Sequence, residues 1–172
     1  MFEARDIKTG DKTEFYRELA QQLEALLHGE PDPIANAANT AALLFQTMPE
    51  LNWAGFYLMR DGELVLGPFQ GRPACVRIAV GAGVCGTAVA RRASVLVEDV
   101  HAFPGHIACD AASRSELVVP LIAAGEVIGV IDLDSPSVAR FDEADQRGIE
   151  RVAAIYLAAC AQAPAPVLAR AS

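Results

Sequence analysis

Residues 52–66 read NWAGFYLMRDGELVL, and this stretch decides the fold. Residues 53–59 are rich in aromatic and apolar side chains, Asp61-Gly62 is a hairpin turn signal, and residues 63–66 alternate in polarity. Two strands joined by so tight a turn are antiparallel. The stretch therefore predicts the start of an antiparallel sheet.

Four more segments have strand character. They are residues 74–80, 95–98, 117–122 and 127–133, and the last two are joined around Ala124-Gly125. The chain is thus expected to form a sheet of six strands.

Helical patterns flank the strands on both sides. Thr13 is the expected N-cap of a first helix that ends at Gly29. Asp32 followed by Pro33 begins a second helix, and Asp142 caps a long closing helix. The expected core face of the second helix comprises Ile34, Ala38, Ala41, Leu44, Phe45 and Met48.

This order of elements predicts an α+β fold in a single domain. The N- and C-terminal helices should pack on one face of an antiparallel six-stranded sheet, and loops should cover a ligand pocket on the other. The 172 residues have the length of one domain, expected over residues 1–160, with a frayed tail at 161–172. Residues 99–116 lack regular signals and are expected to form a functional loop.

Charge and hydropathy exclude several kinds of partner. The chain has 14 basic and 22 acidic residues, a formal charge of -8 that repels nucleic acid and anionic lipid. It has no apolar run of roughly 20 residues and no secretory leader pattern at its start. We therefore expect no nucleic acid, no membrane and a cytoplasmic location, where thiols stay reduced.

The glycine-rich stretch GAGVCG, residues 81–86, matches the dinucleotide-binding fingerprint letter for letter. A dinucleotide fold also needs a long crossover helix, yet only residues 87–92 are available before the next strand. We interpret the stretch as a glycine turn that starts a short helix. Such a turn can present backbone N–H groups to a small anion such as a carboxylate.

Three of the four cysteines fall within one 35-residue stretch. Cys75 lies beside a loop, Cys85 lies in the glycine turn next to a helix N-terminus, and Cys109 lies in the long polar loop. Thiolates are stabilised and exposed in such places, so a redox or nucleophilic role is indicated. Cys160 lies apart on the closing helix and is interpreted as a core residue.

His101, His106, Cys109 and Asp110 are candidate ligands of a metal ion by residue type. These residues form no CxxC or HxxxH pair, the spacing that typical zinc sites have. We expect no metal there and interpret the histidines as hydrogen-bond partners within the loop.

Three acidic residues, Glu116, Asp132 and Asp134, flank the last two predicted strands. Asp132 and Asp134 point to the same face because strand side chains alternate. Asp134 is equally consistent with a turn that ends the strand. Asp132 lies within a hydrophobic strand, where two neighbouring carboxylates require a cation or a proton. A bound ammonium group would meet that need.

Trp53 and Tyr57 share one face of the first predicted strand. An aromatic wall beside carboxylates suits a cation that carries an apolar tail. Packing in the core is the competing explanation for both residues.

Five motifs together resemble the free methionine-(R)-sulfoxide reductases, single-domain proteins of the GAF fold. The resemblance extends over residues 52–145, and the motif at 99–110 is specific to that family rather than to GAF domains at large. The motifs are NWAGFYL at 52–58, LGPFQGRPAC at 66–75, GVCGTA at 83–88, DVHAFPGHIACD at 99–110 and GVIDLDSP at 129–136.

The resemblance implies a role for each residue of the site. Cys109 matches the nucleophile and Cys75 its resolving partner, whereas Cys85 matches a cysteine that has been assigned either role. The substrate pocket would be formed by three carboxylates and two aromatic side chains, namely Glu116, Asp132, Asp134, Trp53 and Tyr57.

The implied reaction is thiol-dependent reduction of free methionine-(R)-sulfoxide. Cys109 attacks the sulfur, Glu116 or one of the aspartates gives a proton to the departing oxygen, and Cys109 becomes a sulfenic acid. Condensation with Cys75 gives a disulfide that a thioredoxin-type reductant opens. No metal or bound cofactor is expected.

The alternative is a GAF sensory module that binds a small ligand without turning it over. Such a module does not require three clustered thiols, so the cysteines favour the enzyme. The sequence leaves the oligomeric state open, with a homodimer as one option.

Overall fold

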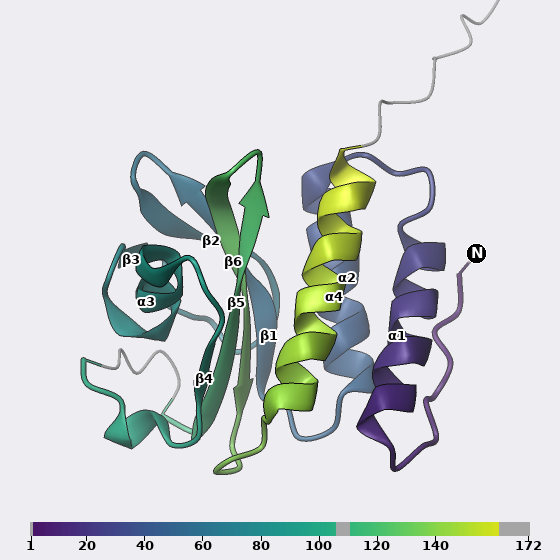
Figure 1. The fold of residues 1–172 in the computed structure, drawn as a ribbon, viewed down its shortest axis with the longest axis horizontal. Coiled ribbons are helices and arrows are strands. Elements are labelled where there is room, and N and C mark those ends of the chain that lie inside the picture. Colours follow the sequence, from purple (N-terminus) through teal and green to yellow (C-terminus); the bar gives the residue numbers. More distant parts are fainter. Residues whose placement is uncertain (1, 106–110, 162–172) are drawn as a thin grey trace, which may run out of the picture.

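The computed structural model describes residues 2–105 and 111–161. Six strands form one sheet in the order β3-β2-β1-β6-β5-β4, with every neighbouring pair antiparallel (Figure 1). The predicted sheet of six antiparallel strands is confirmed. Its strands are β1 Trp53–Arg60, β2 Glu63–Gly71, β3 Arg77–Ala79, β4 Val95–Val97, β5 Ser115–Ala123 and β6 Glu126–Ser135.

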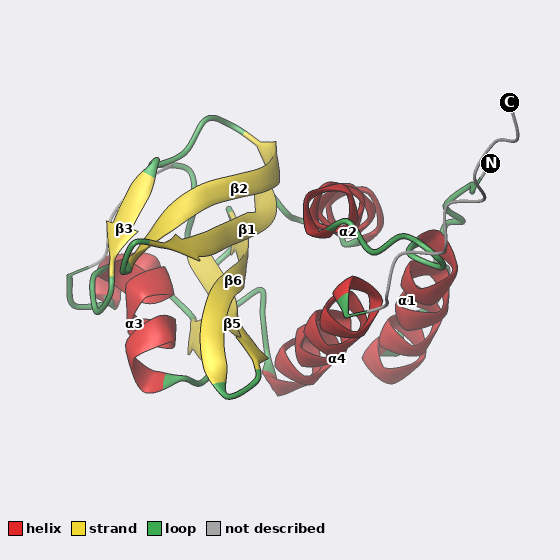
Figure 2. Ribbon diagram, turned by 90° about the horizontal axis from the view of Figure 1, so that it is seen from above, coloured by secondary structure: helices red, strands yellow, loops and turns green. Residues whose placement is uncertain are grey.

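Helices lie on both sides of this sheet (Figure 2). On one side, α2 (Pro33–Thr47) and α4 (Glu143–Cys160) lie next to the strands, and α1 (Lys12–Leu26) lies outside them. On the other side lies α3 (Gly83–Arg91), and the short 3-10 helix η1 (Val100–Ala102) follows β4. None of the described helices combines the length and the apolar character needed to cross a membrane.

The strands are apolar on both faces because both faces are covered. Along β1, Phe56 packs in the cluster beneath the three outer helices, whereas its neighbour Tyr57 packs in the cluster beneath α3. Along β6, Ile131 faces the outer helices and Val130 faces α3. The sheet thus separates two apolar cores, and α3 creates the second.

The helix starts follow from local capping, with one correction. Asp32 caps α2 and Asp142 caps α4, as predicted. The N-cap of α1 is Asp11, whose side chain accepts a hydrogen bond from the Glu14 N–H at 2.8 Å, so the prediction of Thr13 was wrong. The Asp11 carboxylate satisfies one free N–H group of the first turn, and the helix begins two residues earlier than expected.

The predicted core face of α2 was also partly wrong. Ile34 is 46% exposed, Phe45 is 37% exposed, and Ala38 is exposed as well. The helix packs on the sheet beside α4, with α1 farther out, so its buried stripe is centred elsewhere. The residues of α2 that are buried are Asn36, Ala37, Thr40, Ala41, Leu43 and Leu44.

Candidate active site

A pocket lies between α3 and the face of the sheet that α3 covers. It contains all five predicted substrate-binding residues together with Cys85. The remaining lining comes from the segment after β2, from β3 and the start of α3, and from the segment before β5. The lining residues are Trp53, Tyr57, Arg72, Pro73, Ala74, Ile78, Ala82, Gly83, Val84, Cys85, Ser113, Glu116, Asp132 and Asp134.

The register of the sheet gathers the three carboxylates. Glu116 on β5 is paired with Asp134 on β6, and Asp132 is two residues earlier on the same strand. On its other side β6 pairs with β1, where Trp53 is opposite Asp134 and Gly55 is opposite Asp132. Residues at even spacing share a face, so the acidic groups and the aromatic residues meet beneath α3.

Trp53 and Tyr57 form the predicted aromatic wall. Their rings are stacked with centroids 5.8 Å apart, and the Phe69 ring also stacks with Trp53, with centroids 5.3 Å apart. Gly55 lies between them on the strand, and a Cβ there would lie 2.6 Å from the Trp53 ring. The wall therefore depends on a glycine at this position.

The polar atoms of the wall hold the segment that carries Cys75. The Trp53 Nε1–H donates to the carbonyl of Arg72 at 3.1 Å, and the Tyr57 hydroxyl donates to the carbonyl of Cys75 at 3.0 Å. Two buried aromatic side chains thus satisfy their own polar groups and fix the backbone beside the pocket.

The glycine-rich stretch forms a turn followed by a short helix, as predicted. The Gly81 N–H donates to the Gly86 carbonyl at 2.8 Å, and Ala82 is the N-cap of α3 without a side-chain hydrogen bond. A Cβ at Gly86 would lie 2.3 Å from the Ala79 carbonyl oxygen, so the close approach of helix and turn requires glycine. No side chain caps the N-terminus of α3, and Ala82, Gly83 and Val84 at this end of the helix line the pocket.

Cys85 departs from its predicted environment. It is 3% exposed, and burial together with the nearby Asp132 and Glu116 raises the pKa of its thiol well above the usual value. The expectation of a stabilised, exposed thiolate is wrong for this residue. It lies in α3 facing the sheet, where acidic neighbours outweigh the proximity of a helix N-terminus.

Glu116 and Asp132 are buried and act on each other. Burial and the charges of Asp132 and Asp134 raise the pKa of Glu116 well above its usual value. Burial raises the pKa of Asp132 to about 7, while hydrogen bonds with Cys85 and Glu116 act in the opposite direction. At neutral pH the pair therefore holds at least one proton, which makes it a potential general acid.

Of the other three cysteines, the structure describes Cys75 and Cys160. Cys75 is half-buried and disulfide-bonded. Cys160 is half-buried against the outer core, where the Asn36 Nδ2 donates to its sulfur at 3.7 Å, in line with a structural role. Cys109 lies outside the described residues.

Of the four residues weighed as a metal set, only His101 is described. Its ring Nδ1 lies 3.1 Å from the Asp99 carboxylate, a contact within the loop. His106, Cys109 and Asp110 lie outside the described residues. A different group has the geometry for a metal ion, namely Cys85, Glu116 and Asp132.

Sequence reasoning missed two residues of the pocket. Ser113 is 4% exposed and accepts a hydrogen bond from the Asn52 Nδ2 at 3.0 Å, and Arg72 lies at the exposed rim. The residues GRP before Ala74 form a turn signal next to the motif of Cys75, which could have pointed to Arg72. No local pattern singles out Ser113.

Comparison with known proteins gives consistent matches. Residues 35–159 match the GAF domain family. Protein YtsP of Bacillus subtilis is 55% identical over 157 residues, covering 90% of this chain and 96% of that protein. A free methionine-R-sulfoxide reductase of Escherichia coli is 55% identical over 144 residues, covering 84% and 87%. The X-ray structure of free methionine-R-sulfoxide reductase from Neisseria meningitidis with its substrate superposes with a TM-score of 0.89 at 46% identity, covering 93% of this chain and 96% of that one.

Proposed function

Since the chain belongs to the GAF-domain family of free methionine-R-sulfoxide reductases, we propose that it reduces free L-methionine (R)-sulfoxide to methionine in the pocket beneath α3. One observation carries the proposal. The pocket places Glu116, Asp132 and Asp134 beside an aromatic wall and the open N-terminus of α3, a set that matches a free amino acid with an apolar tail.

Each part of the substrate has a partner in this proposal. The ammonium group pairs with the carboxylates, of which Asp132 has a buried oxygen, Oδ1, with no hydrogen-bond partner. The N–H groups at the start of α3 receive the carboxylate. Trp53 and Tyr57 contact the methyl end. A peptide-bound residue has an amide in place of the ammonium and would leave the buried acids unpaired.

The chemical step uses a thiol and a buried acid. The Cys109 thiolate attacks the sulfoxide sulfur, and the sulfoxide oxygen is protonated. The resulting hydroxyl group then moves to the Cys109 sulfur as the bond between the two sulfurs breaks, so methionine is released and Cys109 becomes a sulfenic acid. Glu116 supplies the proton to the oxygen, since the high pKa of this side chain keeps it protonated at neutral pH. Cys75 then condenses with the sulfenic acid, forming a disulfide and water.

Cys85 is proposed to assist rather than to attack. A nucleophile must ionise, and the two neighbouring acids raise the pKa of the Cys85 thiol. Cys85 instead hydrogen-bonds Asp132 and contributes to the proton balance of the pocket.

Turnover requires an external reductant. We propose a thioredoxin-type dithiol that opens the disulfide by exchange, which places the cycle in the reducing cytoplasm. A homodimer stays a prediction that sedimentation of the reduced protein tests.

The test supplies reduced protein with thioredoxin, its reductase and NADPH. Free methionine-(R)-sulfoxide should drive NADPH oxidation, whereas the N-acetylated compound should react at least 100-fold more slowly in kcat/KM. Calorimetric binding of the sulfoxide without any turnover would instead favour a GAF sensory module. Equal rates for the two compounds would remove the proposed ammonium site.

A further inference from the structure

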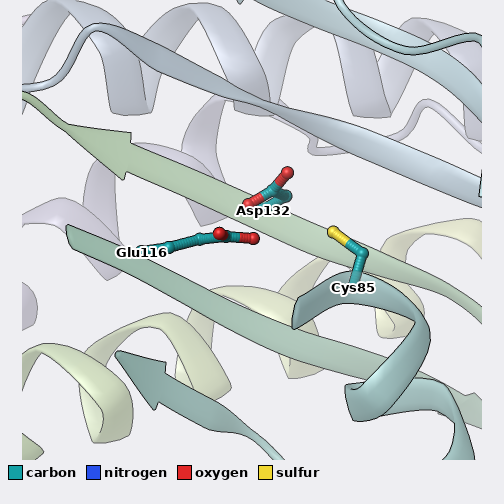
Figure 3. A group of neighbouring side chains, drawn as sticks. All are labelled: Cys85, Glu116 and Asp132. Carbon is teal, nitrogen blue, oxygen red and sulfur yellow. The ribbon is translucent and has the colours of Figure 1, made fainter. Parts of the chain in front are cut away.

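Three possible metal ligands converge from three different elements. Cys85 comes from α3, Glu116 from β5 and Asp132 from β6, and their side chains point toward one another (Figure 3). One ligand atom of each lies within 4.8 Å of the other two. In a tetrahedral zinc site with bonds of about 2.0–2.3 Å, ligand atoms are roughly 3.3–3.8 Å apart. Side-chain rotations that move the ligand atoms by about 1 Å would therefore bring all three within bonding distance of one ion.

The cluster contains a buried carboxylate oxygen that could accept a bond to a cation. All three residues are buried, and the Asp132 Oδ1 atom is fully enclosed without a hydrogen-bond partner. Asp132 as a whole is only 6% exposed. Among the described residues that line the pocket, Arg72 is the one basic side chain, and it lies exposed at the rim. A cation that enters the pocket is thus drawn to these three ligands.

We propose that Cys85, Glu116 and Asp132 form a site for a thiophilic divalent cation, with zinc as the matching ion, and that the bound ion excludes the substrate. The site itself stands on the geometry, whereas its inhibitory effect rests on the proposed function, in which the same carboxylates receive the ammonium group. The ion is an inhibitor here and takes no part in the reduction.

The donor set selects the class of ion. A thiolate favours zinc, cobalt and cadmium over magnesium and calcium, which prefer oxygen ligands alone. Three protein ligands leave a fourth position for water. Binding involves no change of oxidation state, because the Cys85 thiol and any protonated carboxyl release their protons to solvent as the bonds to the ion form.

The test measures metal binding directly, on protein reduced with a phosphine that carries no thiol. Cobalt is the probe, since a cobalt–thiolate bond absorbs in the near ultraviolet and a tetrahedral site absorbs in the visible. We expect one equivalent of cobalt per chain, displaced by one equivalent of zinc. A chromophoric chelator in competition then gives the zinc affinity.

Variants locate the ion. Cys85→Ser should abolish the thiolate band and weaken zinc binding at least 100-fold, and Asp132→Asn should weaken it at least 10-fold. Cys160→Ser, a change to the cysteine on α4, is the matched control and should bind as the parent does. Asp132→Asn is nearly isosteric, so it keeps the test valid if Cys85→Ser fails to fold. Cys75→Ser and Cys109→Ser should retain the band.

Methionine is the second probe. It should weaken the apparent zinc affinity at least 10-fold at saturation, and zinc should raise the apparent KM for the sulfoxide. Zinc bound equally well by Cys85→Ser, or bound without any effect of methionine, would overturn the inference. A chain that binds zinc at this site but reduces no sulfoxide would refute the proposed function alone, whereas an active enzyme that does not bind zinc would refute the inference alone.

Discussion

A carboxylate is buried on each side of the sheet, and the two carboxylates differ in the partners that surround them. On the side of the outer helices, Asp145 is 1% exposed and accepts hydrogen bonds from the Tyr16 hydroxyl at 2.8 Å, from Lys12 and from Arg140. On the α3 side, Asp132 is 6% exposed, and its neighbours are a thiol and a second acid.

The difference separates a structural acid from one that the proposed function assigns to substrate binding. Asp145 also closes the capping box of α4, and its partners come from α1 and from the residues just before α4. It fixes the helical layer through its own contacts. Asp132 has no cation among its described contacts, and the proposed function supplies one in the ammonium group of the substrate. The predictions below test this contrast, beginning with the largest effect.

Removing the structural acid should cost the most stability. Asp145→Ala leaves the largely buried Arg140 side chain and the Tyr16 hydroxyl without their shared partner, and breaking a buried ion pair of this kind costs about 3–5 kcal/mol. Urea unfolding measures the loss. The exposed Glu143→Ala on the same helix is the control, with a change within about 0.5 kcal/mol. A loss below about 1 kcal/mol for Asp145→Ala would erase the contrast.

Removing the functional charge should have the converse effect. Asp132→Asn should lower kcat/KM for free methionine sulfoxide about 100-fold, equivalent to about 2.7 kcal/mol, because the ammonium loses a buried partner. The stability at pH 7 should stay the same or rise. Glu126→Gln, at an exposed position on the same strand, should leave both quantities unchanged. Full activity in Asp132→Asn would assign the ammonium to other residues.

The two acids should also differ in their effect on the pH dependence of stability. The folded pKa of Asp132 is about 7, above the unfolded value near 3.8, so its contribution is fully present below about pH 4 and is lost as the pH rises through 7. Between pH 5 and 7 the wild type should lose about 2 kcal/mol relative to Asp132→Asn. Parallel curves for the two proteins would contradict the raised pKa.

Alanine substitutions of two glycines, one on each side of the sheet, test the same comparison and should have the smallest effects. A Cβ at Gly148 would lie 2.2 Å from the Tyr16 ring. Gly148→Ala should therefore cost about 1 kcal/mol, since overpacking is partly offset by the better helix propensity of alanine. Activity per folded molecule should be unchanged.

Gly55→Ala is the matched change on the other side of the sheet. It pushes against Trp53 and Phe69, so it should raise KM several-fold at a similar cost in stability. Equal KM values for the two alanine variants would show that the aromatic wall does not contact the substrate.

The elements that the sequence predicted are those with local signals. The Asp61-Gly62 turn, the Asp32-Pro33 start of α2 and the cap at Asp142 each depend on a few adjacent residues, and all three are present. The face shared by Trp53 and Tyr57 follows from strand alternation alone. Local chemistry therefore predicted most element starts and the side of the sheet on which the site lies.

The errors arise where distant segments decide. Whether Cys85 is exposed depends on how α3 packs on β5 and β6, and no spacing within residues 81–86 reveals that the sulfur meets two acids. The exposure of Ile34 depends in the same way on where α4 lies against α2. Tertiary packing overrides such local readings.

The pairing of β5 with β6 makes the site sensitive to insertions and deletions in a way that the fold is not. Shifting β6 by one residue would turn the Asp132 and Asp134 side chains to the face covered by α2 and α4. A single residue added there would therefore remove both carboxylates from the pocket, even if the sheet still formed. The irregularity between Leu121 and Ile122 lies between the hairpin tip and Glu116. A change in loop length at the tip is therefore expected to alter the pairing on the tip side of this irregularity and to leave the register of Glu116 with Asp134 unchanged.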